Sequence, residues 1–116
     1  MIKLIKGGEE FNNILPPKDY EQCYKLVEDD KTIGAGTINK DKENLMYIFV
    51  KQELRGNGYG KILFSKMLDE AKKIGYKEIP LTFPKENIRM VKIVNDNGGL
   101  HISTDENEVK YIIPLK

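Results

Sequence analysis

The chain has 116 residues and a formal net charge of +1, from 19 Lys and Arg against 18 Asp and Glu. A chain of this length forms one domain with a single core. Its balanced charge argues against an electrostatic nucleic-acid binder, which usually shows a basic surplus. The single cysteine, Cys23, excludes an internal disulfide and a cysteine-built metal cluster.

The hydropathy pattern shows no sign of a membrane or secretory protein. No run reaches the roughly 18 apolar residues of a membrane span. The N-terminal segment Met1–Lys6 is too short and too charged for a signal peptide. We therefore expect a cytoplasmic protein with residues 1–116 as one domain, no metal site, and Cys23 as a small residue within a strand.

The first part of the chain is predicted to be rich in strands. Ile2–Ile5 fits a short strand, and Glu9–Leu15 fits one or two helical turns that the following proline pair ends. Gln22–Val27 and Thr32–Ile38 are predicted to pair as a hairpin around a charged turn. Leu45–Val50 is the most hydrophobic stretch, which predicts a central strand.

An amphipathic helix is predicted after the glycine-rich segment Arg55–Gly60. Its apolar residues recur every three or four positions, as on one helix face: Leu63, Met67, Ala71 and Ile74, widened by Phe64 and Leu68. Gly75 stands where a helix C-cap belongs. Glu78–Phe83 is the next strand, and because a helix links it to Leu45–Val50, we expect these two strands to be parallel. Pro80 should interrupt its pairing on one side.

The last part of the chain predicts a second helix and two strands. Asn87 opens the helix and Asn97–Gly99 ends it, with one face formed by Ile88, Val91 and Val94. Leu100–Ser103 and Val109–Leu115 are the final strands. Apart from the short segment at the N-terminus, the predicted order is β-β-β-α-β-α-β-β, an α/β fold with helices packed on a mixed sheet.

The strand, glycine loop and helix around residue 58 predict an anion site. Gly56, Gly58 and Gly60 let the backbone turn sharply and approach a ligand. The first amides of the helix lack partners within it and sit at its positive end, where a phosphate fits. A dinucleotide site would need G-x-G-x-x-G directly after the strand, and a P-loop would need Ser or Thr after Lys61. A glycine turn without a ligand is the remaining alternative.

A more specific match comes from two motif blocks. The stretch from Tyr47 to Gly60 resembles the acetyl-CoA site of the GNAT N-acetyltransferase superfamily, whose signature is Gln/Arg-x-x-Gly-x-Gly/Ala placed five residues after a strand valine. The residues that fill this signature are Val50, Arg55, Gly58 and Gly60. Family members also carry an Asn that opens the next helix and a Gly eleven residues later, as Asn87 and Gly98 do. The resemblance implies a GNAT-like acyl-CoA N-acyltransferase fold with an abbreviated N-terminal part.

This resemblance implies acetyl-CoA as cosubstrate and assigns its binding residues. The main-chain amides that would hold the CoA pyrophosphate are those of Arg55, Gly56, Asn57, Gly58, Tyr59, Gly60 and Lys61. Lys61 would add charge near a phosphate. The free backbone edge of Phe49 and Val50 would pair with the pantetheine arm, like an added strand. Asn87 would line the cleft, and a helix N-cap is its ordinary structural role.

The residues expected to carry catalysis depart from the family pattern. Many members place a general-acid tyrosine seven residues after the helix-opening Asn, where this chain has Val94. Three tyrosines are unranked substitutes: Tyr47, Tyr59 and Tyr111. For the general base, Glu43 lies near the position of a family glutamate, although strict counting reaches Asn44.

We predict an acetyl-CoA-dependent N-acetyltransferase that moves an acetyl group directly to a primary amine of a small molecule or peptide. Gly7–Glu21 supplies at most one short helix where family members usually have two. An open acceptor side, or a pocket completed by a second subunit of a homodimer, is therefore expected. Two other hypotheses stay open, a CoA-responsive regulatory module without chemistry and a nucleotide-binding domain.

Overall fold

The computed structural model describes residues 1–7, 20–40 and 42–115. The predicted helical turns at Glu9–Leu15 lie outside these residues, and so does most of the segment in which we expected an open acceptor side.

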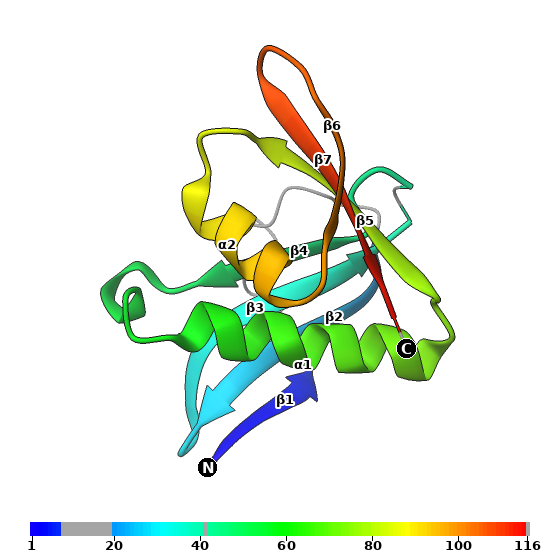
Figure 1. Cartoon of the computed structure of the whole chain (residues 1–116). Helices are drawn as coiled ribbons and strands as arrows, with labels where there is room; N and C mark the ends of the chain where they lie inside the picture. The colour runs from blue at the N-terminus through cyan, green and yellow to red at the C-terminus, as the bar shows by residue number, and fades with distance from the viewer. Residues whose placement is uncertain (8–19, 41, 116) are drawn as a thin grey trace.

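The first half of the chain forms a four-stranded antiparallel sheet (Figure 1). Its strands are β1 (Ile2–Lys6), β2 (Tyr20–Glu28), β3 (Lys31–Asn39) and β4 (Met46–Val50), in that spatial order. The predicted hairpin is β2 and β3, and Cys23 is buried within β2. The N-terminal segment is a full member of the sheet, so four strands precede the first helix where the predicted order had three.

The second half forms two helices and a three-stranded antiparallel sheet. After the short 3-10 helix η2 (Gln52–Leu54) come α1 (Tyr59–Ile74), β5 (Glu78–Pro84), α2 (Ile88–Asp96), β6 (Leu100–Thr104) and β7 (Glu108–Pro114). The spatial order of the strands is β5-β7-β6. Apart from η2, which was not predicted, each of these helices and strands matches a predicted one. Gly75 caps α1 with a left-handed φ of 117°.

The expected parallel ladder between β4 and β5 does not form, because the two strands belong to different sheets. One main-chain hydrogen bond joins their starts, from the Leu45 amide to the Pro80 carbonyl at 3.0 Å. The two main-chain groups of a strand residue point to the same side, so the missing N–H of Pro80 also faces β4. Pairing of β5 is therefore interrupted on one side, as predicted, while the other side pairs with β7.

Helix α1 packs on one face of the first sheet, where glycine permits a close approach. A Cβ atom on Gly36 would lie only 2.9 Å from the Met67 sulfur. The buried residues of α1 match the predicted stripe, except that Ile74, at the end of the helix, is 41% exposed. On the opposite face of the sheet, Tyr47 and Phe49 pack against Ala35 as a separate small cluster.

Helix α2 buries less of its predicted face. Val94 is fully buried, and the Gly99 amide donates to its carbonyl at 2.8 Å. A Cβ on Gly99 would meet the Val94 side chain, which explains why glycine stands there. Ile88 is 77% exposed at the start of the helix, so the predicted face is only partly buried. Among the described helices, none is long and apolar enough to cross a membrane.

Candidate functional site

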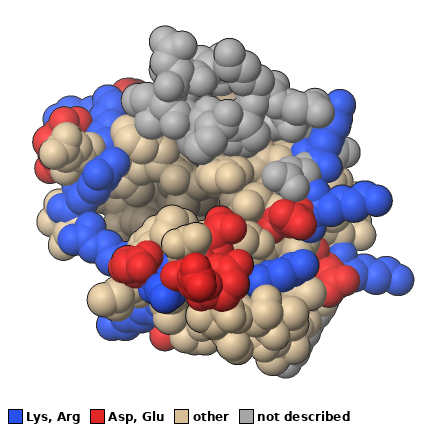
Figure 2. Space-filling view, turned by 90° about the horizontal axis from the view of Figure 1, so that it is seen from above, with Lys and Arg blue, Asp and Glu red and all other residues tan. Residues whose placement is uncertain are grey.

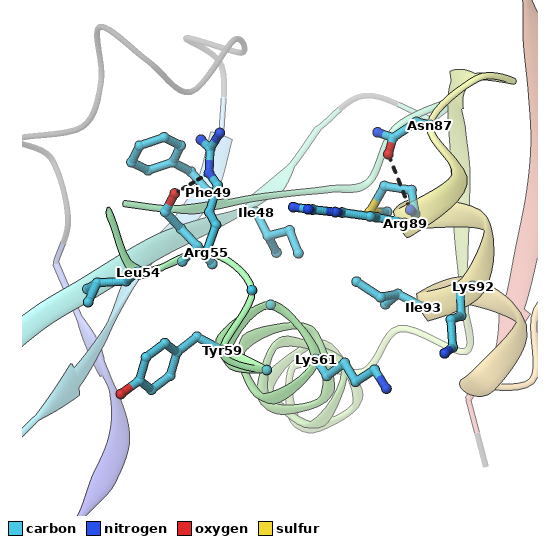
Figure 3. A pocket seen from close by; sticks show the side chains of 15 residues that line it. Ile48, Phe49, Leu54, Arg55, Tyr59, Lys61, Asn87, Arg89, Lys92 and Ile93 are labelled. Atoms are coloured by element: carbon cyan, nitrogen blue, oxygen red, sulfur yellow. Dashed lines mark hydrogen bonds between the residues drawn. The ribbon is translucent and has the colours of Figure 1, made fainter. Parts of the chain in front are cut away.

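A cavity of about 470 Å³, called here the first cavity, lies between β4, the glycine loop and α2 (Figure 3). Its lining residues are Ile48, Phe49, Val50, Leu54, Arg55, Gly56, Gly58, Tyr59, Gly60, Lys61, Asn87, Arg89, Met90, Lys92 and Ile93. Nine of the ten residues predicted to bind a cofactor are among them. Asn57 is not, because its side chain turns back and donates to the Leu54 carbonyl at 3.2 Å.

The glycine loop has the geometry of an anion site. Gly56 and Gly58 adopt left-handed φ values of 86° and 84°, and no atom lies within 4 Å of a Cβ built at either position. Glycine is therefore needed for conformation rather than for space. Gly58 caps α1, and the Ile62 amide donates to its carbonyl at 3.3 Å. The amides of the first turn before Ile62 have no carbonyl one turn earlier in the helix.

The free edge of β4 borders the same cavity. The Lys51 amide donates to Ile33 of β3 at 3.0 Å. Because main-chain groups alternate in direction along a strand, those of Phe49 also turn toward β3. The groups of Ile48 and Val50 then face the opposite edge. From the sequence we predicted that the main-chain groups of Phe49 and Val50 face the free edge. In the observed register those of Ile48 and Val50 face it, and those of Phe49 face β3.

Arg55 ties the glycine loop to the end of β4. Its Nε donates to the Val50 carbonyl at 2.9 Å, and its guanidinium lies 5.4 Å from the centroid of the Phe49 ring. Figure 3 marks the hydrogen bond and shows the Arg55 and Phe49 side chains next to each other. The signature arginine therefore holds the loop in place and covers one acceptor of the strand edge.

Two cations of α2 also line the first cavity, and the sequence reasoning missed them. Arg89 reaches from α2 toward Ile48, while Lys92 lies on the same side of the pocket as Lys61 (Figure 3). Their spacing of three residues places them on one helix face. This spacing could have identified them from the sequence as a cationic pair. Among the described residues that line this cavity, none is acidic. The first cavity therefore favours an anionic ligand.

Tyr59 lines the first cavity, and its hydroxyl anchors the start of α1 to β2. Its hydroxyl donates to Glu28 Oε1 at 2.7 Å and points away from the centre of the pocket (Figure 3). This hydrogen bond to the Glu28 carboxylate raises the pKa of Tyr59, and burial and the negative charges of Glu28 and Asp29 act in the same direction. The phenol is therefore neutral and engaged as a donor.

A second cavity, of about 280 Å³, lies between β4 and β5. Its lining residues are Asn44, Met46, Tyr47, Ile48, Phe64, Leu81, Thr82, Phe83, Pro84, Asn87, Met90 and Glu108. Ile48, Asn87 and Met90 line both cavities, so the two adjoin. Asn87 is the N-cap of α2, where its Oδ1 accepts the Met90 amide at 3.3 Å.

The residues considered for catalysis are separated by the fold. Tyr47 lines the second cavity, whereas Tyr111 is buried and stacks on Phe83 with ring centroids 5.8 Å apart. Glu43 lies in an exposed bend before β4, outside the lining of both cavities, and its neighbour Asn44 lines the second. Val94 is in the core and lines neither cavity.

Several solved structures share this fold. A Bacillus subtilis acetyltransferase in complex with CoA matches with a TM-score of 0.77 and 19% identity over 99% of this chain and 98% of that chain. The Campylobacter jejuni N-acetyltransferase PseH in complex with acetyl coenzyme A matches with a TM-score of 0.76 and 14% identity over 100% of both chains. The ribosomal-protein-S18-alanine N-acetyltransferase from Escherichia coli matches with a TM-score of 0.75 and 12% identity over 100% of this chain and 95% of that chain.

Comparison at the sequence level assigns the family. No curated protein gives a significant match. The family model for the acetyltransferase (GNAT) domain matches residues 3–92, which covers most of the chain and includes both β4 and the glycine loop. The chain therefore belongs to the GNAT acetyltransferase family, as the motif blocks around Gly58 and Asn87 predicted.

Proposed function

We propose that the protein is an acetyl-CoA-dependent N-acetyltransferase that transfers the acetyl group directly to a primary amine of a small molecule or peptide. One observation carries the proposal: the glycine-capped start of α1 opens into a cationic cavity beside the free edge of β4. Structures of similar fold that hold CoA or acetyl coenzyme A support it.

The first cavity would hold acetyl-CoA. The amides of the glycine loop suit the pyrophosphate, and the side chains of Lys61, Arg89 and Lys92 supply the balancing positive charge. The outward main-chain groups of Ile48 and the outward amide of Val50 would pair with the pantetheine arm, while Arg55 already binds the Val50 carbonyl. Arg55 would keep the loop and this strand edge in register.

The adjoining second cavity would receive the acetyl end and the amine. The amine nitrogen attacks the thioester carbonyl carbon, an N–C bond forms, and the C–S bond breaks. The amine loses one proton, and the departing thiolate gains one. A main-chain N–H at the edge of β4 would stabilise the developing oxyanion. Since Val94 is buried and apolar, the thiolate proton would come from water or from Tyr47, and Glu43 stays our proposed base from the sequence.

The direct test incubates the protein with acetyl-CoA and a panel of amines and peptides, and follows thiol release. We expect turnover with at least one primary amine, because the two adjoining cavities would hold acetyl-CoA and the amine side by side. No release above background across the panel would contradict the proposal. Calorimetry with CoA and with its adenine-nucleotide fragment checks the ligand: equal affinity would favour a nucleotide-binding domain instead.

A CoA-responsive regulatory module is the second candidate. Val94 favours it, because a buried valine stands where many family members carry the general acid. This alternative predicts CoA binding without thiol release, together with a partner protein that is captured only when CoA is present.

A further inference from the structure

The two adjoining cavities differ in charge. The first cavity is lined by four cationic side chains and no acidic one among the described residues. In the second cavity, Glu108 is the one charged side chain among the described lining residues. Seen from above, the molecule is hollowed, with Asp and Glu side chains gathered on one side of the hollow and mostly Lys and Arg on the other (Figure 2).

The fold fixes the position of Glu108. It is the first residue of β7 and pairs with Pro84 of β5. The amide of Glu108 donates to Asp105 Oδ1 at 2.7 Å, and its carbonyl accepts the Asp105 amide at 2.9 Å. The backbone that carries Glu108 is therefore held by two hydrogen bonds within the β6–β7 turn.

The alternation along β7 decides which way Glu108 faces. Val109, Tyr111 and Ile113 are buried in the core. Because successive side chains of a strand point to opposite faces, Glu108 lies on the face away from that core. Thr82 of β5 alternates with buried Leu81 and Phe83 in the same way, and it also lines the second cavity.

The size of the second cavity limits its occupant. At about 280 Å³ it lies at or below the lower end of the range of roughly 300–1,000 Å³ for small-molecule sites. Its apolar lining, which includes Met46, Leu81 and Phe83, suits an aliphatic chain. A carboxylate at its border suits a cationic group on that chain.

We propose that Glu108 determines acceptor specificity by binding an aliphatic amine that is cationic at neutral pH in the second cavity. This inference rests on the proposed N-acetyltransferase function and adds the substrate class. Glu108 attracts the ammonium form into the cavity, and the reacting nitrogen becomes nucleophilic after it loses a proton. Glu108 is thus a binding residue, and its loss should act on KM more than on kcat.

The experiment compares the wild-type protein with Glu108→Gln. The matched control is Glu106→Gln, in the same turn but outside the second cavity. Two acceptors are used, an aliphatic amine and aniline, which is uncharged at neutral pH. For Glu108→Gln we expect KM for the aliphatic amine to rise about tenfold, as for the loss of a charge-assisted hydrogen bond. KM for aniline, KM for acetyl-CoA and kcat should change less than about twofold.

Three results would overturn the inference. The first is an unchanged KM for the aliphatic amine in Glu108→Gln. The second is an equal rise in KM for both acceptors, and the third is an equal rise in the Glu106→Gln control. If no amine is acetylated at all, the proposed function fails, and calorimetric titration of the aliphatic amine into CoA-loaded protein decides the binding role. Binding that is lost in Glu108→Gln would support it, while absent or unchanged binding would refute it.

Discussion

Glycine is required for different reasons at different positions of the chain. Gly58 needs a left-handed φ of 84° but has open space where a Cβ would stand. Gly34 has the opposite requirement, because a Cβ there would collide with the Phe49 carbonyl of the neighbouring strand. Gly58 is therefore tied to the anion site and Gly34 to the pairing of β3 with β4.

Replacing Gly58 with Val should abolish CoA binding at concentrations that saturate the wild-type protein. A β-branched residue in the left-handed region costs about 1–3 kcal/mol, and relief of this strain would move the amides that face the ligand. Calorimetric titration of CoA measures the effect. The control is Gly75→Ala, which imposes a similar backbone cost at φ 117° at the other end of the same helix.

Gly75→Ala should lower stability and leave CoA affinity within about twofold of the wild type. Retained CoA binding in Gly58→Val, in protein that is folded by circular dichroism, would contradict the assignment of the loop.

At the scale of elements, the β6–β7 turn is built around one carboxylate. Asp105 Oδ1 accepts the amides of Asn107 and Glu108 at 2.8 and 2.7 Å. The Glu108 amide lowers the pKa of Asp105 most, followed by the Asn107 amide. Burial opposes them, and the charge of Lys85 adds the least of the lowering effects. This turn also carries Glu108 at the border of the second cavity.

Replacing Asp105 with Ala should lower the melting temperature at neutral pH, and the deficit should shrink in acid. Since the folded pKa of Asp105 is lowered from its ordinary value of 3.8, its contribution is fully present above that unfolded value. It is lost as pH falls through the lower folded value. Thermal unfolding of the wild-type and Asp105→Ala proteins, from neutral pH into acid, measures the difference between their melting temperatures. Glu106→Gln is the control, and a deficit that stays constant down to about pH 2 would contradict this account.

At the scale of the whole molecule, the two sheets are joined by a short polar chain of contacts. The Thr37 hydroxyl donates to Asn39 Oδ1 at 2.7 Å, and both residues are fully buried. Asn39 Nδ2 then donates to the Asn44 carbonyl at 2.9 Å, and Asn44 Oδ1 accepts the Thr82 amide at 2.9 Å. These contacts fix the start of β4 against β5, and the second cavity lies between those strands.

Replacing Asn44 with Ala should destabilise the protein by about 1–3 kcal/mol, because the Thr82 amide loses its acceptor. Urea unfolding measures the loss. Asn44→Asp is the matched control, since it retains an oxygen at the same position and should recover most of the stability. Equal stability of the Asn44→Ala and wild-type proteins would show that the contact does not join the sheets.

The helices, the strands and the glycine loop could be predicted from local sequence patterns. The hydrophobic run of β4, the three-and-four spacing of α1 and the glycines at its ends are local signals, and local backbone preferences enforce them. Asn87 was predicted as an N-cap for the same reason, because a cap depends on residues three or four positions away. The family resemblance of the glycine loop belongs to this local information as well.

The division into two sheets and the sharing of cavities by particular side chains depend on long-range contacts, which local patterns do not specify. The placement of β4 against β5 depends on hydrogen bonds to Pro80 and Asn44, which are far apart in sequence. Packing between elements that are far apart in sequence brings Lys61 and Arg89 together in the first cavity. It also places Glu108 at the second cavity. The hydrophobic pattern of a segment identifies which face of its helix or strand is buried. Contacts between residues far apart in sequence decide which element packs on that face.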